Sequence, residues 1–440
     1  MTRALLYVST RHRSPAIGIS DAIGSGLAPD GGLYVPHRLP QLAIEDFNPR
    51  GSLADTAHTL LTPFFAGDRL AKSLANICRE ALDFDTPLCA LPQDDAYMLE
   101  LFHGPTAAFK DIGARFLAAC LRRLPRSDKH PLTILVATSG DTGAAVGSAL
   151  HRQAGIRVLI LYPDGLVAAR QAHQLGCFGD NVQALRVQGR FDDCQRMVKT
   201  ALHNHVLQTH CPLSSANSIS LGRLLPQMSY YAHTALRYWH NHHMPLGFIV
   251  PTGNLGNALA ALWVQHMGLP IAEVYLACNA NATLPEFFAG ADYRPRQAVT
   301  TLANAMDVGA PSNFERLRWT YPNAIEARSR IRALSVDDAH IQSTLTYHAR
   351  RYDTIICPHT ATAMYLLDRL REEGHRAPCA IVATAHPAKF DQIVEPLAQR
   401  QVPVPSALST MLKRSTNAQP LNATQEALEQ WLRQTTSDAR

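Results

Sequence analysis

Lysine is scarce in this sequence. Lysine and arginine together number 41, and only six of these residues are lysines, at positions 72, 110, 129, 199, 389 and 413. A chain that meets nearly every demand for positive charge with arginine should keep lysine mainly where a guanidinium group cannot serve. One such use is the formation of an imine with a carbonyl cofactor. Of the six lysines, Lys110 is the best candidate for that use.

Several other absences narrow the class of protein. The longest apolar runs are far shorter than the roughly 20 residues that a membrane helix needs, and the amino terminus lacks the apolar segment of an export signal. We therefore expect a cytoplasmic protein without a membrane partner. The nine cysteines form no Cys-x-x-Cys pair, which argues against a disulfide framework and against a zinc site or other metal site. A net charge of +5 without a long basic run argues against a nucleic-acid partner.

Common nucleotide and hydrolase signatures are also missing. The sequence has no G-x-G-x-x-G fingerprint and no P-loop, which disfavours a dehydrogenase and an NTPase. Ser139 does not stand in a G-x-S-x-G elbow, which disfavours a serine hydrolase.

The segment around Lys110 suits a reactive amine. Apolar residues precede it, Gly104 and Pro105 form a turn, and a helical pattern follows at residues 113–124. An amine held there would lose hydration and bind its proton less tightly. The same segment also fits a lysine that caps a buried helix start with its amine in water. The local sequence leaves both interpretations open.

The pattern of apolar runs predicts an α/β fold. From residue 132 onward, short β-branched runs alternate with longer helical patterns, which indicates two open, mostly parallel sheets with flanking helices. Strands are predicted near residues 132–137, 157–162, 182–187, 247–250, 273–278, 353–357 and 379–384. We expect an N-terminal cap domain at residues 1–98, lobes at 99–235 and 236–405, and a helical tail at 406–440. A long helix is predicted at 221–239, followed by a solvated histidine-rich loop at 240–243.

Three predicted strands end in turns that suit ligand binding. The strand at 132–137 leads into Ser139, Gly140, Asp141 and Thr142, where backbone N–H groups and hydroxyls could receive a carboxylate. The strand at 247–250 leads into a Gly- and Asn-rich turn at 253–257 that allows a phosphate to approach the backbone. A third strand delivers Thr384 at its carboxyl end, where open α/β sheets place their ligands. With Lys110, these turns suit a cofactor that has an aldehyde, a phosphate and a ring nitrogen, namely pyridoxal 5'-phosphate (PLP).

These segments resemble those of threonine synthase, a PLP enzyme family of the tryptophan-synthase-β-like fold, also called PLP fold type II. The matching segments run in order over most of the chain, at residues 26–34, 101–106, 137–143, 191–194, 217–219, 304–307 and 384–390. The length and the N-terminal cap resemble the bacterial and fungal branch. The resemblance implies conversion of O-phospho-L-homoserine and water to L-threonine and phosphate, by γ-elimination and β-addition.

The resemblance also implies roles for individual residues. Lys110 would be the Schiff-base lysine and the catalytic residue. The cofactor phosphate would lie against Gly253, Asn254, Leu255, Gly256 and Asn257, and the pyridine nitrogen against Thr384. The substrate carboxylate would bind Ser139, Gly140, Asp141 and Thr142, and the substrate phosphate Asn217, Ser218 and Arg223. His103 and Asp307 lie in matching segments, but no chemical role follows for them.

Some positions depart from the pattern expected of the family. Leu255 stands in place of a phenylalanine, Ser220 and Gly222 in place of Asn and Ser, and residues 162–168 lack a basic residue and a serine. These departures support an alternative: a paralogue that acts on another phospho- or phosphono-amino acid, or that eliminates phosphate without adding water. A PLP-binding protein without activity is a third possibility. The expected partner is a small phosphorylated amino acid, and the chain is expected to be a monomer or homodimer.

Overall fold

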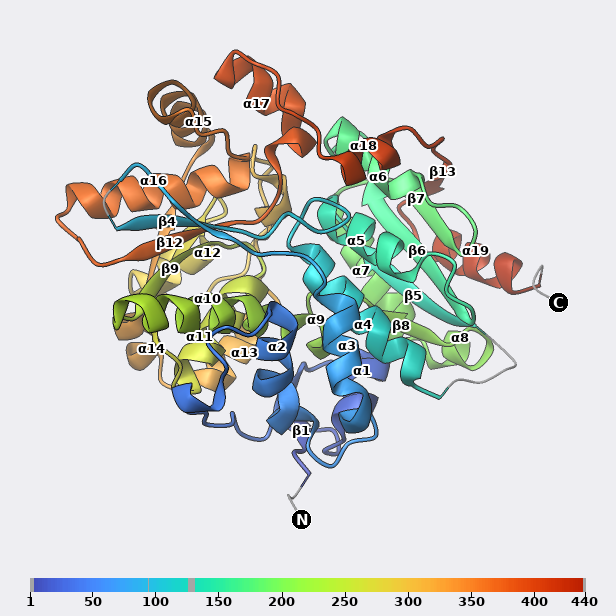
Figure 1. Cartoon of the computed structure of the whole chain (residues 1–440). Coiled ribbons are helices and arrows are strands. Elements are labelled where there is room, and N and C mark those ends of the chain that lie inside the picture. Colours follow the sequence, from blue (N-terminus) through green and yellow to red (C-terminus); the bar gives the residue numbers. More distant parts are fainter. Residues whose placement is uncertain (1–3, 94, 126–130, 438–440) are drawn as a thin grey trace.

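The computed structural model describes residues 4–93, 95–125 and 131–437. Lys129, one of the six lysines, lies outside the described residues. Two large sheets stand on either side of the N-terminal helices, and the C-terminal segment crosses from one sheet to the other (Figure 1).

The first large sheet has five parallel strands in the order β13-β7-β6-β5-β8. Their bounds are β5 Leu132–Ala137, β6 Ile156–Pro163, β7 Val182–Gln188, β8 Leu213–Ser215 and β13 Ala418–Asn422. Alternate side chains enter two separate apolar clusters: Ile134 and Val136 lie in one, and Leu135 and Ala137 in the other. Because side chains of a strand point alternately to its two faces, a sheet buried on both sides needs this continuous apolar sequence.

Helices cover both faces of this sheet. On one face lie α4 Lys110–Arg123, α5 Asp141–Leu150 and α6 Ala169–Gly176. On the other face lie α7 Phe191–His203, α8 His205–His210 and α19 Gln425–Ser437.

The second large sheet has six strands in the order β11-β10-β9-β12-β4-β3, of which only β3 and β4 pair antiparallel. Their bounds are β3 Leu88–Ala90, β4 Ala96–Glu100, β9 Leu246–Pro251, β10 Ile271–Cys278, β11 Ile331–Ser335 and β12 Cys379–Ala383. One face packs on α10 Gln227–His242 and α11 Gly256–His266, and the other on α15 Asp338–Tyr352 and α16 Pro358–Glu372. Here too, alternate strand residues such as Phe248 and Ile249 enter different clusters.

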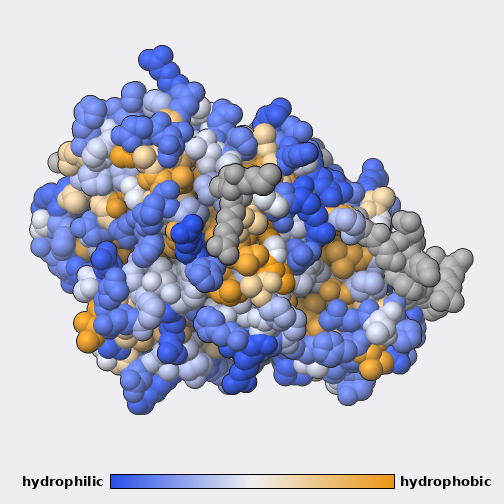
Figure 2. All heavy atoms as spheres, turned by 90° about the horizontal axis from the view of Figure 1, so that it is seen from below, coloured by the Kyte–Doolittle hydropathy of each residue, from blue (hydrophilic) through white to orange (hydrophobic). Residues whose placement is uncertain are grey.

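The N-terminal segment packs on the rest of the molecule and shares its largest apolar cluster. Strands β1 Tyr7–Ser9 and β2 Tyr34–Pro36 pair antiparallel, and helices α1 Ile19–Ser25, α2 Leu53–Leu61 and α3 Leu74–Ala81 pack on α4 and α10. The remaining helices are α9 Leu221–Leu224, α12 Thr283–Phe288, α13 Phe314–Thr320, α14 Ala324–Arg330, α17 Asp391–Ala398 and α18 Ser406–Leu412. Seen from below, the surface of the molecule is mostly hydrophilic, with hydrophobic side chains gathered in smaller areas (Figure 2). None of the described helices is long and apolar enough to cross a membrane.

The predicted fold class is confirmed, whereas several element predictions are wrong. Residues 353–357 are not a strand: the segment is irregular and leads into α16, which begins at Pro358. The helix predicted at 221–239 is two helices, because Leu225 and Pro226 separate α9 from α10. The histidine-rich segment is not a loop, since α10 continues to His242.

The strand order crosses two of the predicted domain boundaries. Strands β3 and β4 pair within the sheet that β9 to β12 form, and β13 of the predicted helical tail pairs with β7. The division into four segments therefore stays a prediction, and each sheet takes strands from distant parts of the chain.

Candidate active site

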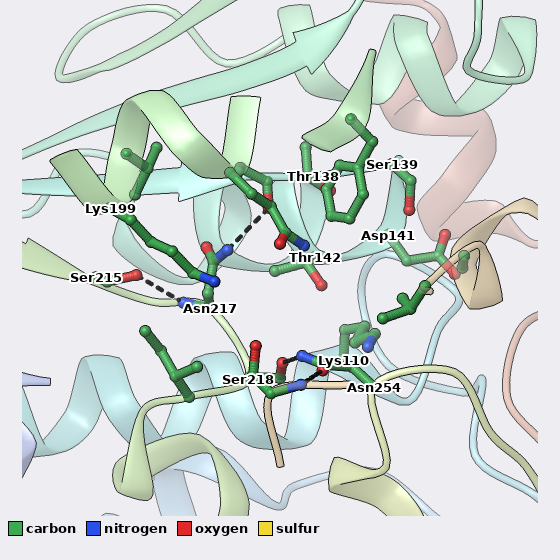
Figure 3. Close-up of a pocket in the computed structure, with 18 of the residues that line it drawn as sticks. Lys110, Thr138, Ser139, Asp141, Thr142, Lys199, Ser215, Asn217, Ser218 and Asn254 are labelled. Atoms are coloured by element: carbon green, nitrogen blue, oxygen red, sulfur yellow. Dashed lines mark hydrogen bonds between the residues drawn. The ribbon is translucent and has the colours of Figure 1, made fainter. Parts of the chain in front are cut away.

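A pocket lies where turns of both halves of the molecule meet (Figure 3). The turn after β5, the turn after β8, the start of α4, one face of α7 and the turn after β9 all contribute lining residues. Seven of the predicted site residues line it, namely Lys110, Ser139, Asp141, Thr142, Asn217, Ser218 and Asn254. The structure therefore brings together residues that are 144 positions apart in the sequence, from Lys110 to Asn254.

Local contacts hold Lys110 at the first turn of α4. The carboxylate of Asp111 accepts hydrogen bonds from the backbone N–H and the hydroxyl of Thr106, each at 2.8 Å. Gly104 is required beside it, because a Cβ atom there would lie 2.6 Å from Oδ2 of Asp111. The N–H of Phe109 donates to the carbonyl of Thr384 at 2.8 Å. These bonds fix the turn before Lys110 and place Thr384 next to it.

The surroundings of Lys110 make its amine a weaker base. Burial, together with the charge of the nearby Arg223 guanidinium, lowers the pKa of Lys110 to about 7, although the Asp141 carboxylate acts in the opposite direction. The Nζ atom also lies 4.5 Å from the centre of the Phe109 ring. At neutral pH, a lysine with a pKa of about 7 is uncharged in a sizeable fraction of molecules. Only the uncharged amine is a nucleophile. The sequence interpretation of a desolvated amine fits this geometry.

The turn after β5 presents two hydroxyl groups at the start of α5. Oγ1 of Thr138 accepts hydrogen bonds from the N–H groups of Gly140 and Gly143, each at 3.0 Å, and so closes the turn. Gly140 has a φ of +138°, a conformation that favours glycine. Ser139 and Thr142 line the pocket beside the positive end of the helix dipole. This end of the pocket can receive an anion such as a carboxylate.

The carboxylate of Asp141 already contacts other protein groups. Its Oδ1 lies 2.7 Å from Nζ of Lys389 and accepts a hydrogen bond from Gln171 at 2.8 Å. Burial alone would raise the pKa of Asp141, but the charge of Lys389 and the hydrogen bonds lower it. Asp141 thus remains a carboxylate that is bound to other protein groups. Its contact with a substrate carboxylate stays a prediction, and this geometry favours such a contact only through the backbone N–H of Asp141.

The turn after β9 packs tightly against a neighbouring segment. Leu255 has a φ of +64°, and a Cβ atom on Gly253 would lie 2.6 Å from Cα of Met306. The side chain of Asn254 donates to Oγ of Ser218 and accepts from the N–H of Ser312. Gly256 and Asn257 follow as the first residues of α11, at the positive end of that helix.

Asn257 carries an unused donor at this turn. Its Oδ1 accepts from the hydroxyl of Tyr231 at 2.8 Å and also from Tyr230. Its Nδ2 is buried and has no hydrogen-bond partner among the described residues. A buried donor without a partner is costly, so a bound acceptor such as a phosphate oxygen would satisfy it.

The predicted phosphate-binding residues separate into two places. Asn217 and Ser218 line the pocket, and Nδ2 of Asn217 donates to the carbonyl of Ala137 at 3.2 Å. Arg223 does not line it: the side chain is 1% exposed, and Nη1 donates to the carbonyl of Ala216 at 2.7 Å. The assignment of Arg223 to a substrate phosphate stays a prediction that this position does not support. Its charge instead acts on Lys110.

Sequence reasoning assigned no role to two other lysines that the structure places here. Lys199 lines the pocket from α7, and Lys389 contacts Asp141. The scarcity of lysine that singled out Lys110 could also have marked Lys199 and Lys389 as candidate functional residues. His103 and Asp307 do not line the pocket. His103 pairs with Glu100 at 2.7 Å, and Asp307 accepts hydrogen bonds from Thr301 and Asn279.

Comparison with known proteins identifies the family. A model of pyridoxal-phosphate-dependent enzymes matches residues 81–387, and models of the threonine synthase N terminus and C-terminal region match residues 6–82 and 360–432. Threonine synthase of Serratia marcescens is 35% identical over 401 residues, which are 89% of this chain and 91% of the relative. The chain belongs to the threonine synthase family. Threonine synthase of Escherichia coli K12 is 34% identical over 395 residues, with the same shares of 89% and 91%.

Solved threonine synthases have the same fold. The Escherichia coli enzyme matches with a TM-score of 0.89 at 31% identity, over 98% of this chain and 100% of that chain. PLP-bound threonine synthase from Brucella melitensis matches with a TM-score of 0.88 at 31% identity, again over 98% and 100%. A PLP-dependent aspartate racemase, at 14% identity and a TM-score of 0.53, shares the fold alone.

The residues of this threonine synthase family member fit its cofactor. The chain is a PLP-dependent enzyme. An amine with a lowered pKa, a glycine-lined turn and a buried amide donor without a partner are the groups that an aldehyde with a phosphate requires. Lys110, Asn257 and the turn before it are the residues that would hold the cofactor.

Proposed function

We propose that this protein converts O-phospho-L-homoserine and water to L-threonine and phosphate in threonine biosynthesis. The observation that supports this most directly is the pocket itself. It brings the amine of Lys110 together with the hydroxyl-rich turn at Ser139 and Thr142 and the polar turn at Asn217 and Ser218. A substrate with an anionic group at each end and an amine near one of them fits these two polar turns and the lysine amine.

The two turns would orient the substrate. The hydroxyls of Ser139 and Thr142, with the backbone N–H groups at the start of α5, would bind the carboxylate. Asn217 and Ser218 would bind the phosphate at the other side. Holding both ends fixes the α carbon near Lys110, and such orientation contributes a large part of catalysis in many enzymes.

The cofactor would be held by groups already described. Lys110 would hold it covalently, the turn from Gly253 to Asn257 would bind its phosphate, and Thr384 would contact its ring nitrogen. When bound, PLP supplies a conjugated ring that takes up the electron pair left when the α carbon loses its proton. A hydroxyl at the ring nitrogen, rather than a carboxylate, would leave that nitrogen largely unprotonated and temper this effect.

Lys110 would then carry protons between carbon atoms of the substrate. Its uncharged amine would take the proton from the α carbon and, after releasing it, one proton from the β carbon. Phosphate would then leave from the γ carbon, and protons would be returned to the γ carbon and, after water has added, to the α carbon. Water would add at the β carbon. A pKa of about 7 suits a group that both accepts and donates a proton at neutral pH. Each such step typically contributes roughly 10²- to 10⁴-fold in rate.

The sequence departures from the family pattern are not at lining residues of this pocket, although Leu255 and Ser220 directly follow lining residues in the chain. Leu255, Ser220, Gly222 and residues 162–168 are not among its lining residues. Location in the cytoplasm and a monomeric or homodimeric state belong to the same proposal, and both rest on the sequence.

One assay tests the proposed function. The purified holoenzyme is incubated with O-phospho-L-homoserine, released phosphate is measured and the carbon product is identified. Threonine in equal amount to phosphate supports the proposal. Phosphate with 2-oxobutyrate would show elimination without hydration, and the absence of both products would refute the activity.

A further inference from the structure

Lys199 stands on the pocket-facing side of α7. Phe191, Gln195, Val198, Lys199 and Leu202 all line the pocket, and their spacing puts them on one side of a helix. Val198 and Leu202 are buried in the apolar cluster beneath the five-stranded sheet, which fixes the rotation of α7. Figure 3 shows the Lys199 side chain extending towards Asn217, on the side of the pocket across from Lys110.

The charge of the pocket is positive and unbalanced. Its charged lining residues are Lys110, Lys199 and Asp141. Asp141 is already paired with Lys389 at 2.7 Å. Lys199 has no ion-pair partner among the described residues: the acidic residue nearest to it in α7, Asp193, pairs with Arg196 instead. An exposed cation is thus left free to meet an anion that enters the pocket.

Polar groups surround this cation. Ser215, Asn217 and Ser218 line the same side of the pocket. Oδ1 of Asn217 is buried without a donor among the described residues, so an ammonium group or a protonated phosphate oxygen can satisfy it. Arg223, the other basic residue considered for this role, is buried, donates through Nη1 to the carbonyl of Ala216 and does not line the pocket, although its Nε has no partner among the described residues.

We propose that Lys199 is the cationic residue that binds the phosphate group of the substrate and the inorganic phosphate product. The part of this inference that concerns the substrate rests on the proposed function. The part that concerns inorganic phosphate does not. A phosphate monoester carries a charge of roughly −1.5 to −2 at neutral pH. A lysine ammonium is a compact charge that binds phosphate without the fixed geometry of a guanidinium. It therefore holds the group while leaving its orientation to Asn217 and Ser218.

The test measures binding of inorganic phosphate to the holoenzyme by calorimetry, for the wild type, Lys199→Gln and Lys199→Arg. We expect Lys199→Gln to weaken phosphate binding by roughly tenfold or more, the size of a charge-assisted hydrogen bond. Lys199→Arg keeps the charge and should retain most of the affinity. Lys72→Gln is the matched control, because Lys72 is an exposed lysine of the N-terminal segment and does not line the pocket.

Salt dependence and kinetics give a second readout. Added KCl should weaken phosphate binding more in the wild type than in Lys199→Gln, because the variant has lost a screened charge. With O-phospho-L-homoserine, Lys199→Gln should raise KM by more than it lowers kcat. Cofactor absorbance should not change, which would separate this role from damage to the cofactor site.

Two results would overturn the inference: wild-type affinity for phosphate in Lys199→Gln, or no phosphate binding by the wild type. Both can occur in an enzyme that forms threonine, so they would leave the proposed function intact. Conversely, weakened phosphate binding in a protein that forms no threonine would support Lys199 and refute the activity.

Discussion

Nζ of Lys389 lies 2.7 Å from Oδ1 of Asp141, and both side chains are almost fully buried. Lys389 follows β12 of the six-stranded sheet, and Asp141 begins α5 on the five-stranded sheet. The same Nζ donates to the carbonyl of Thr106 at 2.8 Å, in the turn before Lys110. One ammonium group thus connects both halves of the molecule with the segment that carries the candidate catalytic lysine.

The Lys389→Met variant should be strongly destabilised. Removing one partner of a buried ion pair leaves the other charge uncompensated, at a typical cost of roughly 3–5 kcal/mol. The double variant Lys389→Met/Asp141→Asn removes both charges and should recover part of the loss. Denaturant midpoints of the two single variants, the double variant and the wild type measure this coupling. Additive losses in the double variant would show that the pair does not interact.

The Lys110→Ala variant should lose turnover, because it lacks both the covalent attachment and the proton carrier. The expected loss in kcat is at least roughly 10²- to 10⁴-fold. Borohydride reduction of the wild type followed by peptide mapping should find the cofactor on the peptide that contains Lys110. A borohydride-reducible cofactor linkage in Lys110→Ala, without added amine, would contradict the assignment.

The rate of cofactor attachment should depend on pH with a midpoint near the pKa of Lys110, about 7. The uncharged amine attacks the aldehyde, so the rate should rise as pH passes through that value and then level off. An ordinary lysine would keep gaining reactivity up to about pH 10.4. Mixing apoprotein with PLP over a pH series measures this, and a blocked free lysine run in parallel corrects for ionisation of the cofactor. A profile parallel to that of the free lysine would refute the lowered pKa.

The Gly253→Ala variant should retain its cofactor poorly. A Cβ atom there would lie 2.6 Å from Cα of Met306, so the backbone of one segment must move. We expect weaker cofactor retention during dialysis, by roughly tenfold or more if the shift removes one charge-assisted hydrogen bond to phosphate. Gly24→Ala is the control, since a Cβ atom at Gly24 meets its nearest neighbour at an ordinary 3.7 Å. Equal retention by both variants would contradict a role of this turn in holding the phosphate.

Much of the fold could be predicted from local sequence, where a strand is a continuous apolar run. The strands near residues 132, 157, 182, 247, 273 and 379 all occur, because burial on both faces demands such runs. Edge strands escaped this reasoning. Strand β13 has the sequence AQPLN, with Pro420 in its middle, which only an edge strand tolerates. Residues 353–357 have an apolar strand pattern, but Pro358 begins α16 directly after them.

The candidate site also has residues that the local sequence predicts and residues that only the packing reveals. Lys110 and the turns after β5 and β9 carry local signals, namely a lysine in an apolar segment and glycines with hydroxyls or amides after a strand. The role of Lys199 depends on which face of α7 meets the pocket, and that depends on packing against the sheet. Likewise, nothing in the sequence around Lys389 shows that its partner is 248 residues earlier in the chain.

Strand β13 joins β7 only through residues 418–422, close to the carboxyl end of the chain. The other sheet, in turn, includes β3 and β4, which are synthesised before most of its other members. Neither sheet therefore has all of its strands until β12 or β13 has left the ribosome. In each sheet, a strand made early pairs with a strand made late: β4 pairs with β12, and β7 pairs with β13. The last steps of folding therefore fall in the same stage of synthesis for both halves.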